Sequence, residues 1–195
     1  MRPQPNIFAL FLVSASMVLL QGCFPLAATG LGAAVMMVDD RRSTGLYIED
    51  ENIEWRARAK LVEKYKDAHV NVTSYNLTVL LTGEVYSEDI KREIGEAIRA
   101  IANVRNVTNE LTINGNSSFA SRSSDTIVTT NVKARLINNG RVSPNHVKVV
   151  TENSVVYLLG VVTREESDAA AEIARTTSGV ARVVKVFEYI DNAPK

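Results

Sequence analysis

The sequence has a single cysteine, Cys23, which follows an N-terminal segment typical of exported proteins. Arg2 supplies a positive charge, and an apolar run from Ile7 to Leu20 is broken only by two serines. With the small residue Gly22 before the cysteine, this pattern predicts a signal peptide. The run is too short for a membrane-spanning helix, which needs ~20 apolar residues. Because no second cysteine is present, an intramolecular disulfide is excluded.

The residues around the cysteine, Leu20-Gln21-Gly22-Cys23, resemble a bacterial lipobox. The resemblance implies that residues 1–22 are removed and that Cys23 carries a covalent lipid such as palmitate. We expect no other cofactor. Phe24 after the cysteine, in place of an aspartate, implies anchoring in the outer membrane with the protein facing the periplasm. The alternative is an ordinary signal peptide followed by an incidental cysteine.

The histidines and carboxylates of the sequence form no recognisable metal-binding or catalytic pattern. His69 and His146 occupy equivalent positions of two repeats described below, so they are interpreted as a duplicated structural feature. Two histidines without a cysteine or a nearby carboxylate constellation make a poor zinc site. Glycine-rich phosphate loops and Gly-x-Ser-x-Gly elbows are absent from the sequence. We therefore expect no enzyme activity, no catalytic residue, no metal site and no small-molecule substrate.

The composition is that of an ordinary globular protein. Of 195 residues, 46% are hydrophobic and 23% are charged, which argues against general disorder. Lys+Arg and Asp+Glu both number 22, and no basic tract occurs. This balance gives no support to a nucleic-acid partner.

Behind the cysteine, residues 24–38 are uniformly apolar and rich in small side chains. With a proline and two glycines in only 15 residues, this segment is not expected to span a membrane alone. It is interpreted either as a tether at the lipid surface or as an element packed on the folded body. Asp39-Asp40-Arg41-Arg42 ends the apolar run, and Ser43-Thr44-Gly45 is expected to form a turn.

The remainder of the sequence is an internal repeat. His69-Val70-Asn71-Val72 aligns with His146-Val147-Lys148-Val149, and the glycines Gly83 and Gly160 then coincide. Two copies of one unit thus run over residues 50–113 and 124–190. The polar stretch between them, residues 114–123, is expected to be a flexible linker.

Each copy is predicted to fold as helix–strand–strand–helix–strand. The first helix is expected to begin at Asp50 in copy one and at Ser124 or Asp125 in copy two, as N-cap residues. The second helices are expected to begin at Ser87 and Thr163. Apolar residues at four-residue spacing mark the buried faces of the first helices: Ile53, Ala57, Leu61 and Tyr65, then Val128, Val132 and Leu136.

The predicted strands cover residues 70–73, 77–85 and 106–113, and then 147–151, 155–162 and 182–190, with turns at 74–76 and 152–154. Asn103 and Gly179 are expected to end the second helices, because Asn and Gly tolerate the left-handed backbone of a helix C-cap. Glu166 three residues after Thr163 predicts a capping box.

The two copies differ in the side chains that the second predicted strand places on the face away from the helices. In copy one the face turned away from the helices is mostly polar, whereas in copy two it carries Val155, Tyr157, Leu159 and Val161. An apolar face of this size is seldom left in water. We expect it to dock on the first repeat or on the apolar tether, with a partner protein as the alternative.

Two αββαβ units with a central Leu-x-Gly strand and a Gly-Val turn into the last strand resemble the BON domain. Leu81-Thr82-Gly83, Leu159-Gly160 and Gly179-Val180 carry the match. The combination with a lipobox resembles the dual BON-domain outer-membrane lipoproteins. The resemblance implies an α+β fold, in which each unit packs a small three-stranded mixed sheet on two helices. The implied divisions are a signal peptide (1–22), a lipidated N-terminus and tether (23–49), BON domain 1 (50–114), a linker (115–123) and BON domain 2 (124–192).

The family further implies a non-enzymatic protein that binds anionic phospholipid through its second domain and supports outer-membrane integrity and cell division. The contact surface is expected on the first helix of that domain. Its candidate lipid-binding residues are Ile127, Thr130, Asn131, Lys133, Arg135 and Ile137. The alternative function is a periplasmic scaffold that binds an envelope protein, such as a cell-wall hydrolase activator or the outer-membrane assembly machinery.

Overall fold

The computed structural model describes residues 40–66, 68–114 and 119–191, which form two units. The second has the predicted αββαβ order. In the first, the strand predicted over 106–113 is divided into two short strands, so its sheet has four strands and not the expected three. The first unit comprises α3 (Thr44–Lys64), β1 (His69–Tyr75), β2 (Thr78–Val85), α4 (Glu88–Arg99), β3 (Asn106–Asn109) and β4 (Thr112–Ile113). The second comprises α5 (Phe119–Asn139), β5 (Val147–Glu152), β6 (Val155–Val162), α6 (Arg164–Arg175) and β7 (Arg182–Tyr189). The α+β fold class is confirmed, and both units lie within one compact part of the chain.

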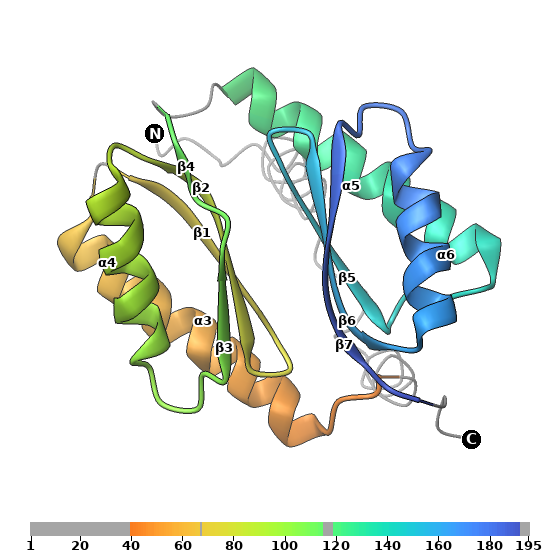
Figure 1. Ribbon diagram of the computed structural model, residues 1–195, viewed down its shortest axis with the longest axis horizontal. Helices are drawn as coiled ribbons and strands as arrows, with labels where there is room; N and C mark the ends of the chain where they lie inside the picture. The colour runs from red at the N-terminus through yellow and green to blue at the C-terminus, as the bar shows by residue number, and fades with distance from the viewer. Residues whose placement is uncertain (1–39, 67, 115–118, 192–195) are drawn as a thin grey trace, which may run out of the picture. The chain divides into compact units, whose positions relative to one another are not determined.

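Each unit contains a small mixed sheet. The strand orders are β1-β2-β3, with β4 also on β2, and β5-β6-β7. The hairpins β1–β2 and β5–β6 are antiparallel, whereas the last strands run parallel to β2 and β6. Within each unit, both helices cover the same face of its sheet (Figure 1).

The hairpin turns are tighter than the sequence pattern indicates. Tyr75 pairs with Thr78, which leaves Asn76 and Leu77 as a two-residue turn with φ of 51° and 65°. The second hairpin repeats this geometry at residues 153 and 154. Positive φ at both central residues is the mark of a type I′ turn, whose twist matches the flanking strands. The turns predicted at 74–76 and 152–154 were therefore wrong by one or two residues.

The first helices begin earlier than predicted. Ser43 is the N-cap of α3, and its hydroxyl accepts a hydrogen bond from the Leu46 amide, so residues 44–49 are helical and not part of a tether. Helix α5 begins at Phe119, inside the expected linker. Neither Asp50 nor Asp125 is an N-cap.

Both aspartates instead bind the hairpin turns of their own sheets. The buried Asp50 carboxylate accepts hydrogen bonds from the backbone amides of Asn76 and Leu77, each at 2.8 Å. Asp125 accepts from the amides of residues 153 and 154, each at 2.9 Å. The turn amides have no partner within the ladder, so these carboxylates join each first helix to its hairpin.

The second helices begin as predicted. Ser87 caps α4, and Thr163 with Glu166 forms the predicted capping box of α6. The helices end before Asn103 and Gly179, but both residues have the left-handed backbone expected of them, with φ of 68° and 87°. The predicted left-handed conformation is thus confirmed, while the helix ends were placed a few residues too late.

Each unit has its own core between its helices and sheet. In the first, Val79, Leu81 and Val85 of β2 pack on the buried face of α3, as alternation predicted. The second core is built in the same way from the predicted stripe of α5. Within the described residues, no helix combines the length and hydropathy that a membrane crossing requires. Cys23 and the apolar segment 24–38 lie outside the described residues.

Candidate functional site

The helix on which lipid contact was predicted, α5, has one buried and one exposed apolar face. Val128, Val132 and Leu136 are buried in the core of their unit. With 3.6 residues per turn, Ile127 and Ile137 lie on the opposite side, and they are 62% and 60% exposed. Large apolar side chains this exposed at two ends of one helix face form a surface suited to an apolar partner or a lipid interface.

The polar candidates on α5 have different environments. Lys133 is exposed and has no hydrogen bond or ion pair with any residue that the structure describes. The Thr130 hydroxyl donates to the Thr126 carbonyl at 2.9 Å, and Asn131 is exposed. Thr130 and Lys133 line a hollow of about 460 Å³ whose other wall includes Asn71 and His69 of the first unit.

Arg135, in contrast, is already bound within the fold. Its guanidinium donates to the Ile173 carbonyl at 2.9 Å and to the hydroxyls of Thr177 and Thr176 at 2.7 and 3.0 Å. These groups lie at the C-terminal end of α6, where a cation is stabilised by the helix dipole. The structure thus uses Arg135 to join α5 to α6, although the residue remains exposed, whereas Lys133 is exposed without such contacts.

Comparison with known proteins decides the family. The sequence matches the BON domain over residues 49–115 and 124–191. The chain belongs to the BON-domain family. The two αββαβ units are therefore the first and second BON domains of one chain.

Three relatives carry the similarity through most of the chain. The outer membrane lipoprotein DolP of Haemophilus influenzae is 40% identical over 178 residues, which are 89% of this chain and 92% of that protein. The 21 kDa hemolysin of Actinobacillus pleuropneumoniae is 33% identical, covering 77% of this chain and 79% of that protein. Osmotically-inducible protein Y of Escherichia coli is 30% identical, covering 71% and 72%.

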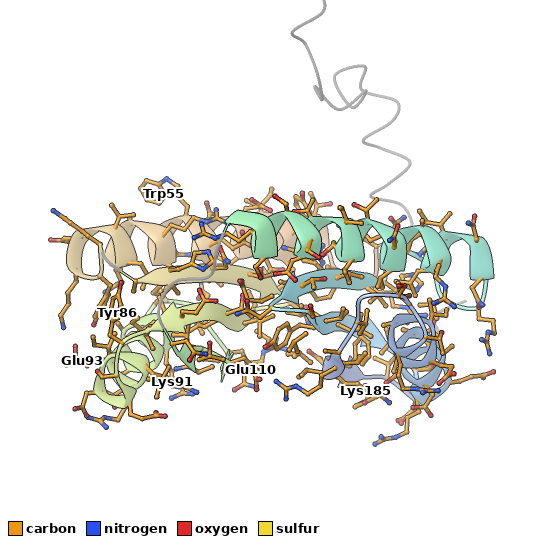
Figure 2. All side chains as sticks on the ribbon, turned by 90° about the horizontal axis from the view of Figure 1, so that it is seen from above. Trp55, Tyr86, Lys91, Glu93, Glu110 and Lys185 are labelled. Carbon is orange, nitrogen blue, oxygen red and sulfur yellow. The ribbon has the colours of Figure 1, made fainter. Side chains whose placement is uncertain are left out.

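The first BON domain has an exposed apolar stripe that sequence reasoning missed. Ile48, Trp55 and Val62 of α3 are all exposed, Trp55 to 70%, and Trp55 stands out from the helix on the side away from its sheet (Figure 2). Their spacing of seven residues places them on one helix face. The seven-residue spacing is visible in the sequence, but the buried stripe predicted for this helix does not include these residues.

The apolar sheet face of the second BON domain is covered by the first. Tyr157 and Leu159 form one buried cluster with Tyr75 and Leu80. Hydrogen bonds surround this cluster, including Asn153 to Glu84 at 2.6 Å and Lys148 to Glu54 at 3.0 Å. The expectation that this face docks on the first repeat is confirmed, and we call the contact between the two sheets the seam.

Two consecutive arginines before α3 bind one domain each. Arg41 donates two hydrogen bonds to the Glu166 carboxylate, at 2.7 and 2.8 Å, and one to the Val161 carbonyl, all in the second domain. Arg42 pairs with Asp40 and with Asp50 of the first domain. Both arginine side chains are 7% exposed, so this segment fastens the two domains together.

The Arg41–Glu166 pair predicts a pH dependence of stability. Burial alone would raise the pKa of Glu166, but the hydrogen bonds from Arg41 and the Thr163 amide outweigh it and lower the pKa to about 2. A carboxylate whose pKa is lowered by folding stabilises the protein above its ordinary pKa, and the contribution is lost as the pH falls toward 2. We expect a loss of about 2 kcal/mol in the free energy of unfolding between pH 5 and 2 from this group.

Urea unfolding of the wild type and of Glu166→Gln across this pH range measures the contribution. The variant should be less stable at pH 7 and should lose less stability toward pH 2. Glu172→Gln, an exposed carboxylate of the same helix, is the control and should follow the wild type. Parallel pH profiles for wild type and Glu166→Gln would contradict the assignment.

A cluster at the seam brings together three residues that are far apart in the sequence, namely His69, Glu84 and Glu152. His69 Nδ1 lies 2.7 Å from Glu84 Oε2, and Glu152 of the second domain lies beside them. Burial raises the pKa of Glu152, an effect that the hydrogen bond from Asn71 offsets only in part. Sequence reasoning assigned His69 no carboxylate constellation, because Glu152 joins it only when the two domains dock.

Proposed function

We propose that this protein is a lipid-anchored, non-enzymatic component of the outer membrane, facing the periplasm, whose second BON domain binds anionic phospholipid through α5. Acylated Cys23 is the anchor. The contact supports membrane integrity and the envelope at division sites. The coarse assignment rests on similarity to an outer membrane lipoprotein along nearly the whole chain.

The exposed face of α5 is the observation that supports lipid contact. Ile127 and Ile137 project from it, while the accessible ammonium of Lys133 lies on its flank. An apolar side chain can enter the acyl boundary while a nearby lysine meets a phosphate, which is the arrangement of interfacial helices. Arg135 also holds α5 against α6 through its hydrogen bonds to Ile173 and Thr177.

The acyl anchor and the second domain contribute very different free energies of membrane binding. A base near an anionic leaflet contributes about 1 kcal/mol, and burial of an isoleucine side chain contributes about 2 kcal/mol. Each acyl methylene contributes ~0.8 kcal/mol, so a lipidated cysteine exceeds both many times over. The anchor therefore holds the protein at a membrane, and α5 selects the lipids that it contacts.

Vesicle binding by residues 24–195, which lack the acylation site, tests the proposal. Ile127→Glu should weaken binding to phosphatidylglycerol vesicles at least tenfold, because an apolar insertion worth more than 1.4 kcal/mol is lost. Lys133→Ala should weaken it about fivefold. Co-sedimentation over a range of lipid concentrations gives both values.

Matched substitutions outside α5 control for charge alone. Ala102→Glu adds the same charge at an exposed position of the first domain, and Lys66→Ala removes the same charge after α3; both should bind as the wild type does. Binding that is absent in the wild type, or unchanged in Ile127→Glu, would contradict the proposal. The fluorescence of Trp55, the only tryptophan, shifts to the blue if α3 also enters the membrane.

The alternative of a protein scaffold was based on the sheet face around Tyr157. That face is buried in the seam, with Tyr157 only 3% exposed. A partner protein would first have to separate the two domains. We therefore propose no envelope-protein partner at this face.

A further inference from the structure

Three metal-ligating side chains converge at the seam. His69 begins β1, and Glu84 stands directly opposite it on β2. Glu152 ends β5 of the second domain. One ligand atom from each residue lies within 4.8 Å of the other two.

The two carboxylates of this group are buried. Glu84 is 1% exposed and is paired with His69, whereas Glu152 is 7% exposed, and glutamate is almost never buried to this degree unless it is paired. Glu152 accepts its hydrogen bonds from neutral donors, the Asn71 amide at 2.8 Å and the Thr82 hydroxyl at 3.4 Å. A buried carboxylate with neutral donors alone gains strongly from a nearby cation.

We propose that His69, Glu84 and Glu152 form a site for a divalent transition-metal ion, with Zn²⁺ as the best match, which joins the two BON domains. One imidazole nitrogen and two carboxylate oxygens are zinc ligands, and three protein ligands leave a fourth position for water. The imidazole favours Zn²⁺ over Mg²⁺ or Ca²⁺, which take oxygen ligands.

The surroundings suit such a site. Ligands of a tetrahedral zinc ion lie about 3.4 Å apart, and the three ligand atoms here lie within 4.8 Å of one another. His69 Nδ1 and Glu84 Oε2, which are 2.7 Å apart, would separate slightly as the ion displaces the proton between them. Asn153 Nδ2 donates to Glu84 at 2.6 Å and so orients that carboxylate, as hydrogen bonds to metal ligands commonly do. His69 is partly exposed and lines the hollow beside α5, which gives an ion and its water a route of entry.

Metal content and affinity of the full chain test the proposal. The protein is expressed without a polyhistidine tag, purified in non-ionic detergent, stripped with a chelator and titrated calorimetrically with Zn²⁺ and with Mg²⁺. We expect one equivalent of Zn²⁺, no binding of Mg²⁺, and a higher melting temperature with zinc. Zero stoichiometry for zinc, or equal binding of magnesium, would overturn it.

Variants then assign the ligands. His69→Asn and Glu152→Gln should each lower zinc affinity at least tenfold and remove the rise in melting temperature, with unchanged far- and near-ultraviolet circular dichroism. Glu165→Gln, an exposed carboxylate in the first turn of α6, should bind zinc as the wild type does. Full affinity in Glu152→Gln would place the ion elsewhere. The wild-type stoichiometry decides the question even if a variant fails to fold.

Discussion

Gly83→Ala is expected to unfold the first BON domain or to destabilise it by at least about 3 kcal/mol. A Cβ at this position would lie 2.0 Å from the His69 carbonyl oxygen, and the backbone has φ of +115°. The left-handed conformation alone costs roughly 1–2 kcal/mol for a residue with a side chain. The clash adds more, because the opposing atom belongs to the backbone and cannot move by a rotamer change.

The chain provides controls that separate these two costs. Gly140 has φ of +69° but open space around its Cβ position, so Gly140→Ala should lose only about 1–2 kcal/mol. Gly160→Ala places its Cβ 2.3 Å from the His146 carbonyl and should damage the second domain nearly as severely. Urea unfolding followed by circular dichroism measures all three. Equal losses for Gly83→Ala and Gly140→Ala would show that backbone clash is not the reason for the glycine.

Periodicity was sufficient to predict the fold, because each unit buries its helices through local patterns. Val128, Val132 and Leu136 are spaced for one helix face, and alternation along β2 and β6 separates core from seam. The duplication strengthened each assignment, since the same pattern occurred twice. The starts of the first helices, α3 and α5, were less predictable. Aspartate favours helix N-caps, yet Asp50 and Asp125 bind the hairpin turns of their domains instead.

The site was only partly predictable for the same physical reason. Ile127 and Lys133 could be placed on the exposed side of α5 from helical spacing alone. Arg135 has the same charge as Lys133, but its position beside α6 depends on how two helices pack. The cluster of His69, Glu84 and Glu152 depends on docking of the domains, and no local pattern determines which residues two sheets bring together.

Arg42→Met is expected to lower the free energy of unfolding by about 3–5 kcal/mol. The Arg42 guanidinium lies 2.9 Å from the Asp50 carboxylate, 2.7 Å from Asp40 and 4.0 Å from the centre of the Tyr75 ring. Its loss leaves Asp50, which is 2% exposed, as a buried charge without its cation. Breaking a buried ion pair from one side costs this much because the remaining charge stays desolvated. Methionine retains most of the apolar stem, so the comparison isolates the charge.

Arg92→Met is the matched control, since Arg92 pairs with Asp89 and both side chains are exposed, to 62% and 77%. Exposed pairs contribute less than about 1 kcal/mol, so this variant should stay close to the wild type. A double-mutant cycle with Asp50→Asn identifies the cause: if the uncompensated carboxylate dominates, Arg42→Met with Asp50→Asn loses less than the sum of the two single changes. Additive losses would instead assign the role of Arg42 to its packing against the Tyr75 ring.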